Sequence, residues 1–374
     1  MGELFGAHMK ITRISVWQVD LPLGEGTFTW SGGVLDAFDS TLVRIETDGD
    51  VIGWGESCPL GPTYLPAYAE GVRAGIAHIA PYLIGEVATN VTALNLKMDS
   101  ILRGHPYVKS ALDMACWDIL GKSSGLPVCT LLGGGDATSV PLYRAISQDT
   151  AERMASRVTE YRSQGYSRFQ LKVGGEPDVD IQRILSVAEV LGTGEILIAD
   201  ANGGWLQHQA ARVADALQGL DVYLEQPCRG WDQCLSIRRR TRLPFILDES
   251  IDGVDALLRG HADSAMDMVN IKVSKFGGLT RAARARDLSV EMGLGLIIED
   301  TCGGDIATAA VAHLAQSTPE RHLFASTDLN GYVTRRLADG APRREGGEMK
   351  ASDAPGLGVD PRLEELGSPI LEIA

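Results

Sequence analysis

Charged side chains recur at nearly even intervals through the second half of the chain, and their types suit proton transfer beside a metal ion. Each follows a short apolar run, and neighbours in the series lie about 23 to 28 residues apart. In chain order they are Lys172, Asp200, Glu225, Asp248, Lys272 and Asp300. Such an interval is about one strand plus one helix, so in a barrel of parallel strands all six would reach the same rim. The spacing therefore predicts that they face one cavity.

Three of these residues, Asp200, Glu225 and Asp248, are carboxylates at consecutive predicted strand ends. Hard oxygen ligands of this kind suit Mg²⁺, which keeps other coordination positions open for water or substrate. We therefore expect one Mg²⁺ per subunit, with Mn²⁺ as an alternative. A single strand-end carboxylate is more often a helix cap than a metal ligand, so the prediction depends on all three being in register.

Lys172 precedes the three carboxylates and Lys272 follows them, so the two lysines are expected on opposite sides of the cavity. Removing a proton α to a carboxylate creates an enediolate, whose second negative charge a divalent cation stabilises while a lysine accepts the proton. The accepting lysine must be neutral, so its pKa must fall from about 10.4. Two such lysines permit epimerisation, and the same residues also permit β-elimination of water.

Four other polar residues near predicted strand ends have less specific roles. Asn202 is expected either to orient Asp200 or to contact the metal. Asp300 and Asp328 either bind a substrate ammonium group or cap helices. Lys275, three residues beyond Lys272, is expected in a loop past the strand end.

The segment that carries the series, residues 136–330, alternates short apolar runs with helical periodicity, which is typical of a parallel α/β array. The candidate strands are VPLYRAI, SRFQLKVG, EILIADANG, DVYLEQP, PFILDES, DMVNIKVSK, LGLIIEDT and HLFASTDL. Eight strands can close a barrel. The predicted fold is therefore of the α/β class, a (β/α)₈ TIM-type barrel.

Residues 9–135 read instead as strands followed by helices, which indicates an N-terminal α+β domain that caps the barrel. The Gly-rich segment 331–374, with PGLGVD, is expected to pack back on this capping domain. Residues 1–8 precede a second methionine and are interpreted as a tag or an extension.

Composition narrows the classes of partner. The formal charge of −15, from 34 basic and 49 acidic residues, opposes binding to nucleic acid or to anionic membranes. No apolar stretch is long enough to cross a bilayer, and the six cysteines form no CxxC pair. We therefore expect a cytoplasmic protein whose partner is a small-molecule carboxylate.

From Met9 onward the sequence resembles the mandelate racemase and muconate lactonizing enzyme branch of the enolase superfamily, notably in GWGE at 53–56 and SALDMACWDILGK at 110–122. The known chemistry of that superfamily, a lysine or histidine base with Mg²⁺ beside an enediolate, agrees with the residues above. The resemblance implies that Asp200, Glu225 and Asp248 bind the metal and that Lys172 and Lys272 are the acid/base pair. It also implies a homo-oligomer.

The resemblance further implies a substrate lid, formed by residues 28–33 and 57–64. Within it, WSGG at 30–33 and CPLGPTY at 58–64 are similar to family members that act on proline derivatives, namely hydroxyproline betaine epimerases and cis-3-hydroxyproline dehydratases. Trp30 and Tyr64 are therefore expected to contact the substrate. Gln170 stands where many such enzymes carry a lysine, and we place it in the same group. An acidic Asp328 favours a substrate that keeps N–H donors.

The function expected from these observations is racemisation or epimerisation of an amino acid or proline derivative. The alternative is dehydration of a hydroxy amino acid such as cis-3-hydroxyproline, which the same site could perform. A catalytically silent binding barrel is a third hypothesis, but it predicts a broken carboxylate triad or a missing lysine, and the sequence has neither.

Overall fold

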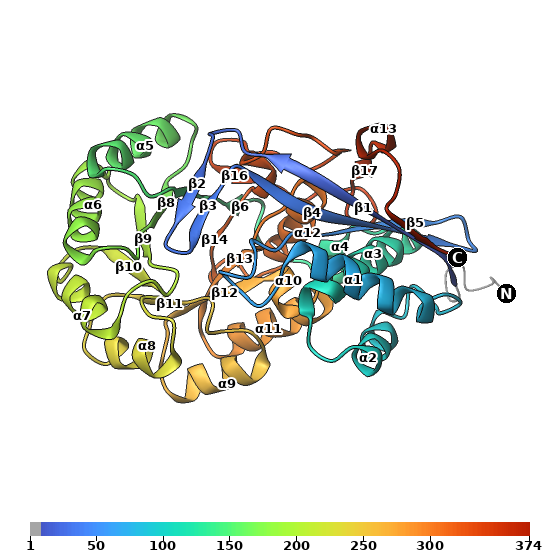
Figure 1. Cartoon of the computed structure of the whole chain (residues 1–374), viewed down its shortest axis with the longest axis horizontal. Coiled ribbons are helices and arrows are strands. Elements are labelled where there is room, and N and C mark those ends of the chain that lie inside the picture. Colours follow the sequence, from blue (N-terminus) through green and yellow to red (C-terminus); the bar gives the residue numbers. More distant parts are fainter. Residues whose placement is uncertain (1–8) are drawn as a thin grey trace.

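The computed structural model describes residues 9–374, so the predicted extension at residues 1–8 lies outside the described residues. Figure 1 shows two lobes side by side: an antiparallel sheet with helices α1–α3, and a barrel ringed by helices α5–α12. The predicted fold, a (β/α)₈ barrel with an α+β capping domain, is confirmed.

The capping lobe is a four-stranded sheet in the order β18-β1-β4-β5. Its elements are β1 (Ile11–Pro22), β4 (Ala37–Thr47), β5 (Ile52–Ser57), α1 (Ala69–Ile79), α2 (Val91–Ile101), α3 (Pro106–Ser124) and α4 (Val128–Leu131). A hairpin of β2 (Phe28–Trp30) and β3 (Gly33–Leu35) projects from it over the barrel (Figure 1). The chain end returns to this lobe, because β18 (Leu371–Ile373) pairs with β1, with Ile373 opposite Ile14.

The barrel consists of eight parallel strands in sequential order, β7 to β14. They are β7 (Tyr143–Ile146), β8 (Arg168–Lys172), β9 (Ile196–Asp200), β10 (Val222–Glu225), β11 (Phe245–Leu247), β12 (Met268–Lys272), β13 (Gly295–Glu299) and β14 (Leu323–Ser326). The covering helices are α5 (Ala151–Ser163), α6 (Pro177–Val190), α7 (Gln207–Ala216), α8 (Trp231–Arg238), α9 (Val254–Ala262), α11 (Leu279–Glu291) and α12 (Asp305–Gln316). A parallel bridge between Leu142 and Ser326 links the first and last strands.

Alternation along the strands decides which side chains fill the barrel. Tyr143, Ala145, Ile198, Ile246, Ile297 and Ala325 form an inner cluster separate from the core between strands and helices. Because side chains two residues apart share a face of a strand, this layer sets the inward positions of each strand. Polar residues at those same positions nearer the carboxyl ends therefore point into the barrel mouth.

The GWGE motif lies on β5, where the sheet packs directly on α3. An added Cβ at Gly55 would lie 1.9 Å from the carbonyl oxygen of Ala111, and one at Gly53 would lie 2.1 Å from that of Ala115. Only glycine allows this approach of strand to helix. The motif therefore has a packing reason in the capping lobe.

Two buried carboxylates of the capping lobe bind the ends of barrel helices. Glu56 accepts hydrogen bonds from the backbone N–H groups of Gly304 and Ala307, at 2.7 and 2.8 Å, at the start of α12. Asp113 accepts from the N–H of Thr280, at 3.0 Å, at the start of α11. Since the first N–H groups of a helix lack intrahelical partners, these bonds join the lobes at helix N-termini.

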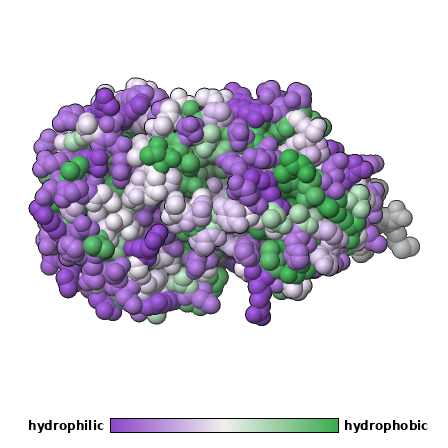
Figure 2. Space-filling model, in the orientation of Figure 1, coloured by the Kyte–Doolittle hydropathy of each residue, from purple (hydrophilic) through white to green (hydrophobic). Residues whose placement is uncertain are grey.

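The outer surface of the barrel is mostly hydrophilic in the view of Figure 2, and hydrophobic side chains gather nearer the capping lobe. Across residues 9–374, no helix is long and apolar enough to span a membrane. The six cysteines are all free, as their spacing predicted.

Candidate active site

The structure brings the six spaced residues to one rim of the barrel. Lys172, Asp200, Glu225 and Lys272 are the last residues of β8, β9, β10 and β12, and Asp248 and Asp300 directly follow β11 and β13. The Lys172 Nζ donates to Asp200 Oδ2 at 2.6 Å, and Lys272 pairs with Asp248. The barrel therefore joins residues up to 128 positions apart in the sequence, from Lys172 to Asp300.

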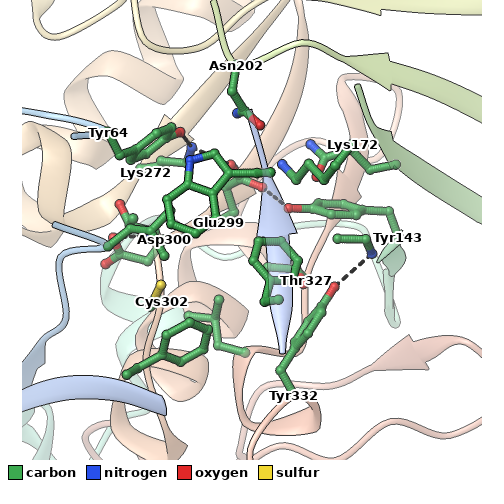
Figure 3. Close-up of a pocket in the computed structure, with 18 residues that line it drawn as sticks. Tyr64, Tyr143, Lys172, Asn202, Lys272, Glu299, Asp300, Cys302, Thr327 and Tyr332 are labelled. Atoms are coloured by element: carbon green, nitrogen blue, oxygen red, sulfur yellow. Dashed lines mark hydrogen bonds and ion pairs between the residues drawn. The ribbon is translucent and has the colours of Figure 1, made fainter. Parts of the chain in front are cut away.

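A cavity of about 70 Å³ opens at this rim, below the β2–β3 hairpin. Lys172, Lys272, Tyr64, Tyr143, Asn202 and Glu299 are among the residues that line it. Figure 3 shows Lys172 with Tyr143 on one side and Lys272 with Tyr64 on the other. The two lysines thus lie on opposite sides of the cavity, as their order in the sequence predicted.

Each oxygen of Asp200 has a different partner. Its Oδ1 accepts from the backbone N–H of Asn202 at 2.8 Å, which fixes the carboxylate on the loop after β9. Its Oδ2 accepts from Lys172. Burial lowers the pKa of Lys172, but the charges of Asp200 and Glu225 outweigh it, and the pKa is raised overall. The fall in pKa expected from the sequence is therefore not found, because the neighbouring carboxylates stabilise the charged form of the lysine more than burial destabilises it.

Glu225, on β10, is fully buried between amides of β8 and β12, each of which is two strands away in the barrel. Asn270 Nδ2 donates to its Oε1 at 2.6 Å, and Gln170 Nε2 donates to its Oε2 at 2.9 Å. Burial and repulsion by Asp200 raise the pKa of Glu225 well above its ordinary value. Gln170 therefore holds a carboxylate in place, besides lining the cavity.

Asp248 is held by two lysines. Lys275 Nζ donates to its Oδ1 at 2.7 Å and to its backbone oxygen at 2.6 Å, while Lys272 Nζ and the Tyr64 hydroxyl bond to its Oδ2. Although burial opposes it, the charges of both lysines lower the pKa of Asp248. The placement of Lys275 in a loop was wrong, because it lies in the short helix α10 (Val273–Phe276) and is buried.

Beside these carboxylates lie two buried oxygen acceptors without a hydrogen-bond donor, Asn202 Oδ1 and Glu249 Oε2. The Asn202 Nδ2 donates to the other oxygen of Glu249 at 3.0 Å. Burial and the charges of Asp248 and Asp200 raise the pKa of Glu249 to about 8. Acceptors that lack donors fit a cation or its bound water better than another carboxylate.

The number of acidic side chains at this rim also fits a divalent cation. Six carboxylates, those of Asp200, Glu225, Asp248, Glu249, Glu299 and Asp300, face three lysines, those of Lys172, Lys272 and Lys275. Within residues 9–374, no three acidic, His or Cys side chains converge closely enough to count as a formed metal cluster, because lysine and amide groups occupy the carboxylate oxygens. The donor set nevertheless suits Mg²⁺ in its chemistry and charge.

Glu299 is an acidic residue that the spacing argument missed. Its Oε2 accepts from the Tyr143 hydroxyl, and its Oε1 lies 3.3 Å from Lys272 Nζ. Strand alternation could have found it, since Ile297 and Glu299 share the inward face of β13. The same rule finds Asn270, which shares the inward face of β12 with Lys272.

Asp300 also lines the cavity, but donors of its own loop and of the neighbouring α10 bind both its oxygens. Its Oδ2 accepts from the backbone N–H and the hydroxyl of Ser274, at 3.0 and 2.7 Å, and its Oδ1 accepts from the N–H of Thr301 at 2.8 Å. Burial raises the pKa of Asp300 to about 7. Of the two expected roles, the structure favours the capping one.

Asp328 lies apart from the cavity, whose lining includes its neighbours Thr327 and Leu329. Its Oδ1 accepts from the Tyr166 hydroxyl at 2.8 Å, and its Oδ2 lies 3.8 Å from Arg344. The Asp328 side chain is not among the residues that line the cavity. The expectation of a substrate contact for Asp328 is therefore not supported, because the side chain turns toward partners outside the barrel mouth.

The two predicted lid segments reach the cavity. Phe28 and Trp30 of the hairpin line it, as do Leu60 and Tyr64 of the segment after β5. The Ser31 hydroxyl donates to the carbonyl of Ala201 at 2.9 Å, which ties the hairpin to the loop after β9.

Comparison with known proteins agrees with this geometry. Residues 153–366 match the family model described as enolase C-terminal domain-like, and residues 28–133 match that of the N-terminal domain of mandelate racemase and muconate lactonizing enzymes. The chain belongs to the mandelate racemase/muconate lactonizing enzyme family. It is thus an enzyme of the enolase superfamily, as its motifs predicted.

Individual members of the family are similar over nearly their whole length. The cis-3-hydroxy-L-proline dehydratase of Roseibium aggregatum is 54% identical over 363 residues, which are 97% of this chain and 99% of that one. The N-succinyl-L-Arg/Lys racemase of Bacillus cereus is 29% identical over 362 residues, 94% of this chain and 95% of the other. Of the two predicted reactions, the comparison favours dehydration, which we had taken as the alternative to epimerisation.

Solved structures of this family superpose closely. The mandelate racemase/muconate lactonizing enzyme from Roseovarius nubinhibens ISM has a TM-score of 0.95 and 40% identity, and covers 98% of this chain and 99% of its own. An enolase superfamily member from the same organism, solved with magnesium, has a TM-score of 0.93 and 41% identity, and covers 98% and 99%. Members of the family thus include a magnesium complex.

Proposed function

We propose that this enzyme is a Mg²⁺-dependent dehydratase that removes water from cis-3-hydroxy-L-proline or a closely related 3-hydroxylated cyclic imino acid. The observation that carries the proposal is the pair of lysines, Lys172 and Lys272, on opposite sides of one cavity, each paired with a carboxylate of the barrel rim. The 54% identity to a dehydratase of this substrate supports the choice of reaction.

The stereochemistry of the substrate agrees with this arrangement. In a cis-3-hydroxyproline the hydroxyl lies on the same ring face as the carboxylate, so the α-proton lies on the opposite face. Elimination of water then needs a base on one face and an acid on the other. Lys172 and Lys272 provide these two positions, because each reaches the cavity from its own side.

In the reaction, one lysine takes the α-proton, the electron pair forms the C2–C3 double bond, and the C3–O bond breaks. The other lysine delivers a proton to the departing hydroxyl, which leaves as water. The resulting enamine tautomerises to a cyclic imine. Both lysines are restored when they exchange a proton with solvent.

Asp200, Glu225 and Asp248 would hold the Mg²⁺, and Asn202 and Glu249 would accept hydrogen bonds from its water. When bound, the ion supplies Lewis-acid stabilisation of the charge that develops on the substrate carboxylate. Tyr64, Lys275, Gln170 and Asn270 keep the carboxylates of Asp248 and Glu225 in place through the contacts described above.

The walls of the cavity suit a compact, partly apolar substrate. Phe28, Trp30 and Leu60 supply apolar surface for a ring. The Glu299 carboxylate in the lining suits a protonated ring nitrogen that keeps N–H donors.

Epimerisation is a second candidate, because a racemase is 29% identical and the two lysines suit that reaction equally. Proton NMR in D₂O with Mg²⁺ distinguishes the two. Loss of the C3 proton pattern of cis-3-hydroxy-L-proline with appearance of an imine supports dehydration. Deuterium at C2 with inverted configuration and an intact hydroxyl would overturn it.

Two lysine variants separate the proton-transfer roles. We expect both K172M and K272M to lower dehydration by roughly 10²- to 10⁴-fold, the usual contribution of a positioned acid or base. The variant that retains the base should still exchange the α-proton, whereas the other should not. If both variants kept the dehydration rate of the wild type, the assignment of Lys172 and Lys272 as base and acid would be contradicted.

A further inference from the structure

The loop that leads into the β2–β3 hairpin is exposed, yet it carries one side chain that reaches the barrel. Residues 24–27 are exposed, and Gly26 has φ of 83° with no atom within 4 Å of a built Cβ. Within residues 9–374, Glu25 is the residue of this loop whose side chain hydrogen-bonds to the barrel. Backbone hydrogen bonds of Gly24 to Tyr332 and of Gln148 to Thr29 also hold this segment, so Glu25 is the side-chain anchor among a small number of contacts.

Three barrel residues surround the Glu25 carboxylate. Arg144 Nη2 donates to its Oε1 at 2.5 Å, the Tyr161 hydroxyl bonds to its Oε2, and Arg157 Nη1 lies 3.9 Å from Oε2. Arg144 belongs to β7, and Tyr161 and Arg157 belong to α5. The hairpin of one lobe is thus tied to the other lobe by a charge-assisted bond.

The arginine at this contact is buried. Arg144 is 3% exposed, and its guanidinium carbon lies 3.7 Å from the centroid of the Tyr332 ring. Its Nε and Nη1 are buried without hydrogen-bond partners, so within the described chain Glu25 is the one hydrogen-bonded acceptor of its side chain. The energetic cost of losing that acceptor is therefore high for Arg144.

The same contact borders the active site. Tyr332, which stacks on Arg144, lines the cavity (Figure 3), and its carbonyl oxygen accepts from the N–H of Gly24 at 2.8 Å. Phe28, three residues beyond Glu25, lines both the cavity and a smaller one that contains Arg144. Glu25 thus lies directly behind the wall that the hairpin forms.

We propose that Glu25 is a positioning residue that latches the β2–β3 hairpin over the active-site cavity through Arg144 and Tyr161. By fixing the start of the hairpin, it holds Phe28 and Trp30 in the cavity wall. Substrate binding then depends on a residue that does not touch the substrate. The kinetic part of this inference rests on the proposed function, but its structural part does not.

Hydrogen–deuterium exchange of the full-length protein, read by mass spectrometry over residues 24–33, tests the latch. The variants are E25Q and E25A, which sit on an exposed loop and should fold, and E25D as the conservative substitution. The matched control is E195Q, which breaks the bidentate ion pair of Glu195 with Arg162 on the same helix α5, away from the hairpin.

We expect exchange over residues 24–33 to rise about fivefold in E25A and E25Q, the scale of one partly exposed charge-assisted pair, with a smaller rise in E25D. KM should rise by a similar factor while kcat changes less. Unchanged exchange in E25A, or an equal rise in E195Q, would overturn the latch. If exchange rises but the wild type does not turn over cis-3-hydroxy-L-proline, the latch stands and the proposed function fails.

Discussion

Lys275 offers a direct test of how the carboxylate set is held together. It is 2% exposed, and its Nζ donates to Asp248 Oδ1 at 2.7 Å, to the Asp248 backbone oxygen at 2.6 Å and to the Asn270 backbone oxygen at 3.3 Å. Lys275 does not line the cavity, and it takes no part in the proposed proton transfers. The substitution K275M keeps most of the apolar part of the side chain and removes the charge and all three bonds.

The expected loss follows from burial. Removing one partner of a buried ion pair costs about 3 to 5 kcal/mol, because the other partner keeps an uncompensated charge. Asp248 would still bond to Lys272 and Tyr64, so the lower end of that range applies. We therefore expect K275M to lower the free energy of unfolding by about 3 kcal/mol.

Equilibrium urea unfolding in EDTA, followed by tryptophan fluorescence, measures this loss. The matched control is K350M, which breaks the ion pair with Asp353, where the side chains are 54% and 82% exposed. Exposed pairs contribute little, so we expect a change below about 0.5 kcal/mol. If K275M were as stable as K350M, the argument that Lys275 neutralises a buried Asp248 would be refuted.

Two further predictions concern parts of the fold away from the chemistry. G55A should destabilise the capping lobe by about 3 kcal/mol in urea unfolding, because its Cβ would meet the Ala111 carbonyl oxygen at 1.9 Å, whereas G253A, which meets no atom within 4 Å, should be nearly neutral. Burial lowers the pKa of His313 from 6.5 to about 4. Between these pH values the unfolded chain therefore binds a proton that the folded chain does not. The free energy of unfolding should fall by about 3 kcal/mol as the pH drops from 6.5 to 4. H313N, whose amide oxygen can still accept from the N–H of Cys129, should lack this part of the pH dependence, and an identical pH profile in both proteins would contradict it.

The spacing of strand-end residues predicted the fold and the rim on which these residues lie. An interval of one strand plus one helix sufficed to place Lys172, Asp200, Glu225, Asp248 and Lys272 on one rim, because parallel strands in a closed barrel share their carboxyl end. This regularity is local in origin. Each βα unit repeats the same geometry, so it is readable from the chain alone.

The alternation of inward and outward side chains along a strand was not applied to the seventh strand of the barrel. Asp300 was selected as the site residue after the seventh strand, although alternation with Ile297 indicates that Glu299 points inward. The structure has Glu299 bonded to Tyr143 and beside Lys272, and Asp300 bonded to Ser274. One residue along a strand reverses the face, so a motif of two acids is ambiguous until the inward face is known.

By itself, the sequence determined which chemistry is available: two lysines and three carboxylates in the order that a barrel brings together. Only the tertiary structure decided how each group is used. That Lys275 holds Asp248, that Asp328 turns toward Arg344 and that Glu25 reaches Arg144 are contacts between distant segments. Local periodicity fixes the direction of a side chain from its strand or helix, whereas its partner depends on how the loops and lobes pack, which no short stretch of sequence encodes.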